Sequence, residues 1–198
     1  MIRDASLACS GLLAPRVGGP SVRPPQPAGV SDLTYAGSAK WVESTGADRY
    51  RRGLYTWFQR TSPYPMLATF DAPDANVCAV RRGRSNTPLQ ALTLLNETTS
   101  VECARALASR VLRGPSADTA SRLDLLFRLC LAREPSAGER AALARLHDGL
   151  KAECQADAEA ASRLIGGGGM GACEPAEAAA WVGVARTVLN LDEFVTRE

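Results

Sequence analysis

Three arginines gather just before a predicted helix start in the stretch AVRRGRSNTPLQALTLLN. They are Arg81, Arg82 and Arg84. Such a cluster could bind an anion, because the free N–H groups of a helix N-terminus already carry about half a positive charge. The anion could be a phosphate, sulfate or carboxylate of a ligand. It could equally belong to the chain, since Asp71 and Asp74 lie a few residues upstream in FDAPD and arginine pairs well with carboxylates. We favour the internal pairing, which predicts that the FDAPD turn folds back onto the arginines.

The other residues with reactive side chains form no recognisable constellation. His147 is the only histidine, and its helical spacing favours a position at the boundary of the core. Metal ligation by His147 would need partners such as Asp148 or Glu153, and no ligand spacing indicates such a site. The glycines at 166–169 lack the lysine and serine or threonine of a phosphate-binding loop, so they predict a flexible connection. We therefore predict no catalytic residue, no metal site and no cofactor.

The six cysteines contain no CxxC pair, which argues against a zinc or haem-attachment motif. Most of them are expected to be small buried hydrophobic residues. Fifteen disulfide pairings are possible for six cysteines, and the sequence selects none of them.

Composition indicates a globular chain. A hydrophobic fraction of 45% is enough for a core, and the net charge of +2 gives no indication of nucleic-acid binding. No apolar run is long enough for a transmembrane helix, and the start of the chain does not resemble a signal peptide. Most aromatic residues fall between residues 30 and 86, where they favour a core over a stacking surface for sugars or bases.

The hydrophobic pattern predicts a mainly α fold: a helical bundle over residues 87–198 with an irregular, loop-rich N-terminal half, together forming a single domain over residues 1–198. In the first half we expect a short helix at residues 3–13, an irregular proline-rich stretch at 15–29 and room for a small hairpin. Thr87 and Gln90 form a capping box ahead of a helix, and Ser136 and Glu139 form another ahead of one long helix that reaches residue 164. Further helices are expected over 98–113 and 116–133, and a last helix begins at Pro175 and turns Trp181 inward.

Four motifs together resemble a known family. They are RR-LYT at Arg51–Thr56, FDAPD at Phe70–Asp74, C-VRR-R-NTPLQAL-LLN at Cys78–Asn96 and LNLDEF-TRE at Leu189–Glu198. The combination resembles the planctomycete-type secreted domain known as domain of unknown function 1553, over nearly the whole chain. The resemblance implies a periplasmic or secreted multidomain protein in which this domain follows a second uncharacterised domain, often with a cytochrome-c-type haem domain. We accordingly interpret the chain as a fragment, the C-terminal part of such a protein.

The resemblance brings no established activity, so the expected function is a non-enzymatic docking or ligand-binding module. Its expected partners are companion domains of the full-length protein, with a cytochrome-c-type domain as one candidate, and neither nucleic acid nor a membrane span is expected. The alternative is an accessory part of an enzyme in polysaccharide degradation or haem-linked redox chemistry, with its catalytic groups in upstream domains. An inert truncated product is a third hypothesis.

Overall fold

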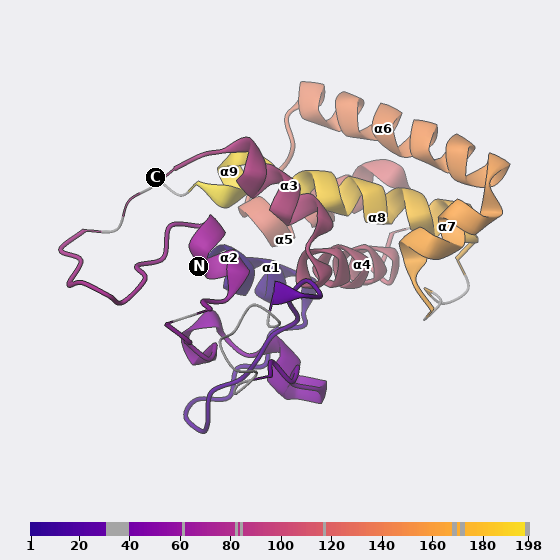
Figure 1. Cartoon of the computed structure of the whole chain (residues 1–198). Coiled ribbons are helices and arrows are strands. Elements are labelled where there is room, and N and C mark those ends of the chain that lie inside the picture. The colour runs from indigo at the N-terminus through magenta and orange to yellow at the C-terminus, as the bar shows by residue number, and fades with distance from the viewer. Residues whose placement is uncertain are drawn as a thin grey trace. The chain divides into compact units, whose positions relative to one another are not determined.

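The computed structural model describes residues 1–30, 40–60, 62–81, 83, 85–116, 118–167, 170 and 173–196. These residues contain nine α-helices and no β-strand, which confirms the predicted mainly α fold class (Figure 1). The helices are α1 (Ile2–Ser10), α2 (Pro65–Thr69), α3 (Pro88–Asn96), α4 (Thr98–Leu112), α5 (Thr119–Leu131), α6 (Ala137–Ala156), α7 (Ala158–Ile165), α8 (Pro175–Leu189) and α9 (Asp192–Val195). Two short 3-10 helices, η3 (Gly46–Tyr50) and η4 (Gly53–Tyr55), also lie in the described first half. No described helix is both long and apolar enough to cross a bilayer.

The chain divides into two compact units. The first unit comprises Met1, Arg3 and Leu13–Ser100, and the second comprises Ile2, Asp4–Leu12 and Val101–Glu198. Helix α3, which begins the predicted bundle, therefore groups with the loop-rich residues. The single domain over residues 1–198 stays a prediction.

The first unit is held together by side chains more than by regular structure. In place of the expected hairpin, its described residues contain two isolated parallel bridges, Ala14 with Arg51 and Val22 with Thr56. Tyr64 is buried, and its ring stacks on Trp41 with 5.7 Å between the ring centroids. Tyr64 therefore lies in the core as its position in the sequence favoured, with the half-buried Trp41 beside it, whereas Trp57 and Phe58 of the same segment are 40% and 37% exposed.

The buried side chain of Arg51 orders the proline-rich stretch. Its Nη1 donates a hydrogen bond to the Pro20 carbonyl at 3.0 Å, and its Nη2 donates to the Arg16 carbonyl at 3.3 Å and to the Gly18 carbonyl. The guanidinium carbon lies 3.8 Å from the centre of the Tyr55 ring. Carbonyl dipoles and the face of an aromatic ring compensate the loss of water around this cation. Arg51 and Tyr55 of the RR-LYT motif therefore hold the proline-rich stretch, which has no regular secondary structure, in one conformation.

The second unit contains two helices where one was predicted after residue 136. The prediction of a single helix to residue 164 is wrong, because Asp157 leaves the helical conformation with φ −130° and ψ 89°. Its carboxylate accepts a hydrogen bond from the Ala160 N–H at 2.9 Å and so caps α7, while its own N–H still closes α6 on the Glu153 carbonyl. An aspartate inside an apolar stripe can start a new helix by capping it. The Ser136–Glu139 capping box at the start of α6 is confirmed.

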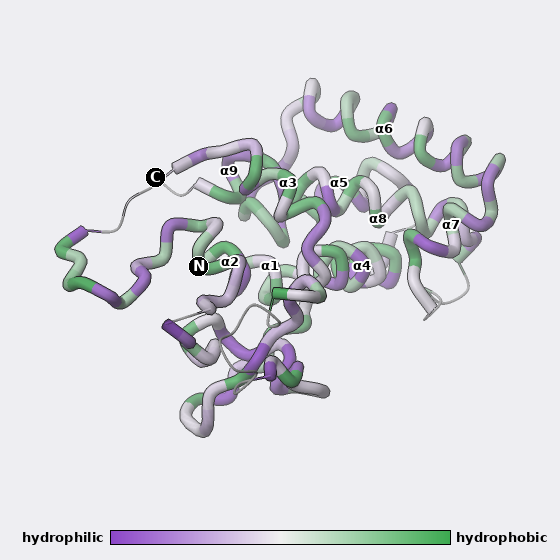
Figure 2. The backbone as a smooth tube through the Cα atoms, in the orientation of Figure 1, coloured by the Kyte–Doolittle hydropathy of each residue, from purple (hydrophilic) through white to green (hydrophobic). Residues whose placement is uncertain are grey.

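Helix α8 forms the core of the second unit. Its predicted inward residues are at most 1% exposed, namely Trp181, Val184, Ala185 and Val188. Helix α6 packs beside α8 and runs in the opposite direction (Figure 1). Hydrophobic and hydrophilic residues alternate along α6 (Figure 2), and only Leu143, His147 and Cys154 are buried on it. The close approach of the two helices depends on a glycine: a Cβ atom at Gly183 would lie 2.4 Å from Cδ1 of Leu150.

Replacing Gly183 by valine is expected to destabilise the chain by about 1–3 kcal/mol, because the added side chain must displace Leu150. Gly149→Ala on α6 is the matched control, since nothing lies within 4 Å of a Cβ at that position. The control should stabilise the chain by about 0.5–1 kcal/mol through the lower flexibility of alanine in a helix. Urea unfolding followed by far-UV circular dichroism measures both free energies. Equal effects of the two substitutions would contradict the packing described.

Candidate functional site

The turn that carries the two predicted aspartates reaches the segment in front of α3. Asp71 has a left-handed φ of 56°, and its Oδ2 accepts hydrogen bonds from the backbone N and the Oγ of Ser85, at 2.8 and 2.7 Å. Asp74 instead accepts hydrogen bonds from the backbone N and the Nδ2 of Asn76, and these bonds lower the pKa of the Asp74 carboxyl. Asp71 therefore contacts the residue that follows Arg84, while Asp74 closes its own turn.

The predicted arginine cluster is described in part. The side chain of Arg81 is exposed, and Arg82 and Arg84 lie outside the described residues. The pairing of the three guanidinium groups with Asp71 and Asp74 stays a prediction. What the structure adds is the Asp71–Ser85 contact, which brings one of the two carboxylates to the arginine-rich segment.

The start of α3 is fixed by a buried glutamine. The predicted capping box is confirmed: Thr87 Oγ1 accepts from the Gln90 N–H at 3.3 Å, and Gln90 Oε1 accepts from the Thr87 N–H at 3.1 Å. Gln90 is only 4% exposed, and its Nε2 also donates to the Thr69 carbonyl and to the Ser85 Oγ, both at 2.9 Å. The amide thus uses both N–H donors and its carbonyl. It joins the end of α2, the residue bound by Asp71 and the first turn of α3.

Helix α3 presents apolar side chains to solvent on its other side. Leu89 is 62% exposed and Leu92 is 55% exposed, and their spacing of three residues places them on one face of the helix. We call these two residues the α3 apolar face. Leu94 of the same helix is buried, so α3 is apolar on two sides. In the segment before α3, Val77 and Val80 are also largely or fully exposed.

His147 in the second unit is more buried than the predicted boundary position, with 3% of its side chain exposed. Its Nδ1 lies 3.1 Å from Asp148 Oδ1, and its Nε2 lies 3.3 Å from Glu177 Oε1. The ring also contacts Trp181, with 5.0 Å between the ring centroids. Both ring nitrogens therefore face carboxylates, and neither is left for a substrate or a metal. Within the described residues no group of three histidine, cysteine or acidic side chains is placed to hold a metal ion.

Glu177 is the centre of this buried cluster. Its carboxylate accepts hydrogen bonds from Trp181 Nε1 at 2.9 Å and Arg122 Nη1 at 3.2 Å, and pairs with Lys151 Nζ at 2.9 Å. Burial raises the pKa of Glu177, but the hydrogen bonds from Lys151 and Trp181 outweigh this effect and lower it. The cluster holds α5, α6 and α8 together through one carboxylate. Sequence reasoning did not single out Glu177; the only available signal was its spacing of four residues from Trp181.

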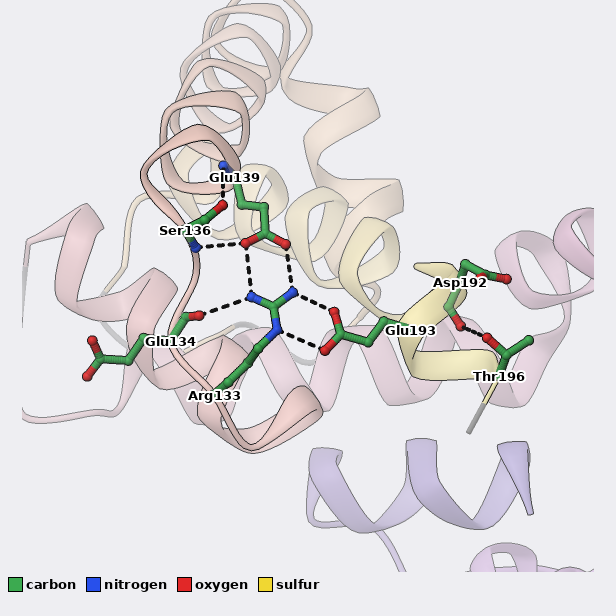
Figure 3. A network of polar contacts seen from close by, with 7 residues as sticks. All are labelled: Arg133, Glu134, Ser136, Glu139, Asp192, Glu193 and Thr196. Carbon is green, nitrogen blue, oxygen red and sulfur yellow. Dashed lines mark hydrogen bonds and ion pairs between the residues drawn. The ribbon is translucent and has the colours of Figure 1, made fainter. Parts of the chain in front are cut away.

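A second network surrounds Arg133 at the end of α5 (Figure 3). Its guanidinium binds both oxygens of Glu139, at 2.9 and 2.7 Å, and both oxygens of Glu193. Glu139 Oε2 also accepts from the Ser136 N–H at 2.7 Å, and these contacts, first that of Arg133, lower the pKa of Glu139 to about 2. Since these side chains are partly exposed, each pair adds little stability by itself. The role of these ion pairs is to position α9, because Arg133 links Glu193 of α9 to Glu139 in the first turn of α6.

The family model described as "PSD1: Protein of unknown function (DUF1553)" matches residues 1–147 of the 198 residues. The chain belongs to the DUF1553 family. No curated protein and no solved structure matches it. The match includes Asp71, the capped start of α3 and His147, and it ends before Glu177 and Glu193.

Three motifs of this DUF1553 chain within the matched residues have structural roles. RR-LYT supplies the buried Arg51, FDAPD supplies Asp71, and NTPLQAL supplies Thr87 and Gln90. All of these residues belong to the first unit. The motifs therefore order loops and fix α3, and the candidate functional surface of this family member is the α3 apolar face beside them.

The carboxylate of Glu177 is expected to make stability depend on pH. Because its pKa is lower in the folded chain than the ordinary 4.5, its contribution is present at neutral pH and is lost as the pH falls through the folded value. Glu177→Gln should therefore lower the free energy of unfolding at neutral pH by about 2 kcal/mol and reduce the further loss on acidification. Urea unfolding at neutral pH and at a pH near 3 measures both.

The matched control for this prediction is Glu159→Gln on α7, whose carboxylate is 84% exposed. It should change the free energy of unfolding by less than about 0.5 kcal/mol at either pH. If Glu177→Gln behaved like the control at neutral pH, the buried cluster would not act as described.

Proposed function

We propose that this DUF1553 chain is a non-enzymatic docking module of an exported multidomain protein, and that its α3 apolar face binds a companion domain. The observation that supports this proposal most is the exposure of Leu89 and Leu92 on a helix whose first turn is rigidly held by Gln90. Complete burial of a leucine side chain contributes about 1.5–3 kcal/mol. Two such residues on a fixed helix give a partner a preorganised anchor at low entropic cost.

The side chains near α3 also indicate what kind of partner surface would complement them. Val77 and Val80 add apolar area in the segment before the helix, and Arg81 is exposed beside them in the sequence. Residues 1–86 carry 11 basic and 6 acidic side chains. A companion domain with an apolar groove and an acidic rim would fit this surface, because charge complementarity steers association while apolar burial supplies affinity. A cytochrome-c-type domain is one candidate for that partner.

The alternative, an accessory role in polysaccharide degradation or haem-linked redox chemistry, has less support from the described residues. The only histidine of the chain has both ring nitrogens against carboxylates, so it is poorly placed to transfer protons to a substrate. The carboxylate of Glu177 is likewise occupied by Trp181, Arg122 and Lys151. This alternative would require the reactive groups to lie in other domains.

The double substitution Leu89→Ser/Leu92→Ser is expected to weaken binding of the companion domain at least tenfold, because it removes the apolar anchor while leaving the cap of α3 intact. The companion domains, the cytochrome-c-type domain among them, would be produced as separate polypeptides and titrated calorimetrically with the chain. Leu54→Ser is the matched control: Leu54 lies on η4 of the same unit and is 78% exposed. It should leave the affinity within about twofold of the unsubstituted chain.

Far-UV circular dichroism of each variant shows whether the fold is kept. The docking proposal would be contradicted by unchanged affinity of the double variant, or by a chain that binds none of its companion domains. A heat of binding with a sugar or another small molecule alone would favour the ligand-binding form of the module.

A further inference from the structure

A cavity of about 310 Å³ lies in the second unit, where the end of α4 leads into α5. Val111, Pro115 and Leu125 contribute apolar side chains to its lining. The turn after α4 lies close against Leu125 because Gly114 has no side chain: a Cβ atom there would lie 2.8 Å from Leu125 Cδ2. The volume is at the lower end of the range for small-molecule sites in proteins, so the cavity suits a compact ligand with an apolar body.

Arg122 brings a positive charge that is only partly neutralised to the lining of the cavity. Its Nη1 donates to Glu177 Oε1 at 3.2 Å, but the same carboxylate pairs with Lys151 Nζ at 2.9 Å, so one negative charge faces two cations. The Arg122 side chain is 15% exposed, and its Nε is buried without a hydrogen-bond partner among the described residues. The guanidinium therefore keeps unused N–H donors and a charge that an anion in the cavity can compensate.

The other two charged side chains of the lining already have partners. Asp124 forms an ion pair with Arg140 at 2.5 Å, and Arg128 forms one with Glu134 at 2.5 Å. Arg128 is also 60% exposed, so water screens its charge. The Asp124 carboxylate repels a second negative charge placed close to it. A ligand with a single negative charge therefore fits this lining better than a doubly charged phosphate.

We propose that this cavity binds a small monocarboxylate with an apolar body, such as an arylacetate. The ligand carboxylate accepts hydrogen bonds from Arg122, whose planar guanidinium matches a carboxylate in shape. The apolar body of the ligand packs against Val111 and Leu125 and leaves water. This site belongs to the second unit, and its occupation is independent of docking through the α3 apolar face.

An NMR titration of the isotope-labelled full chain with phenylacetate tests the proposal. The backbone amides of residues 111–116 and 121–128 and the Nε–H signal of Arg122 should shift together, with a Kd of about 1 mM or lower. Three comparison probes define the ligand class: 2-phenylethanol lacks the charge, acetate lacks the apolar body, and inorganic phosphate lacks the apolar body and carries more charge. Each should bind at least about tenfold more weakly than phenylacetate.

Two substitutions and a control locate the site. Arg122→Lys keeps a positive charge beside Glu177 but removes the planar fork, so it should raise the Kd about fivefold or more. Ser121→Leu narrows the cavity and should raise the Kd at least about tenfold. It keeps the cap of α5, because Asp118 accepts from the backbone N–H of residue 121. Arg145→Lys on the exposed side of α6 is the matched control and should leave the Kd within about twofold.

Two results would overturn the proposal. One is that phenylacetate at several millimolar shifts none of these signals, or shifts signals elsewhere in the chain instead. The other is that 2-phenylethanol, acetate or inorganic phosphate binds the cavity as tightly as phenylacetate does. Both results come from the unsubstituted chain, so they hold even if a variant fails to fold.

Discussion

The side-chain amide of Gln90 is the contact on which the position of α3 in the first unit depends. It donates to the end of α2 and to Ser85, and accepts from the first turn of α3, so three segments meet at one buried group. A buried amide left without partners costs about 1–3 kcal/mol, whereas a satisfied one fixes a single arrangement. Asp71 extends the same contact into the FDAPD turn through Ser85. The orientation of the α3 apolar face follows from this arrangement. Gln90 thereby fixes a helix of nine residues that would be weakly stable by itself, as the proposed docking role requires.

In the second unit a charged group has the corresponding role. The carboxylate of Glu177 gathers the indole of Trp181, the cations of Lys151 and Arg122, and the ring of His147, while the Arg133 network fixes the periphery. His147, the one histidine that the sequence offered for chemistry, is thus held between two carboxylates. A unit of this kind supplies a stable framework, whereas the surface that we propose for a partner lies on the first unit.

Sequence patterns over three or four residues predicted helix starts and buried helix faces correctly. Contacts between residues far apart in the sequence could not be predicted in this way. The capping boxes at Thr87 and Ser136 and the inward face of α8 depend on residues three or four positions apart, so the sequence contained them in full. The break at Asp157 was missed because an aspartate within an apolar stripe fits an exposed helical position as well as a cap. Arg51 meets its carbonyl partners, and Glu177 meets Lys151 and Arg122, only when the chain folds, and no spacing in the sequence predicts these contacts. The FDAPD turn does reach the arginine-rich segment through Asp71, while its pairing with Arg82 and Arg84 stays a prediction.

Hydrogen exchange of a Gln90→Ala variant tests most directly whether this one amide holds α3 in place. The account predicts that backbone amides of α2, α3 and Ser85 exchange about tenfold faster or more, because the Thr69 carbonyl, the Ser85 hydroxyl and the Thr87 N–H all lose a partner. Gln155→Ala on α6 is the control, since Gln155 is exposed and makes one long hydrogen bond to Glu174. Exchange rates in α3 that are the same in both variants and in the unsubstituted chain would contradict the account.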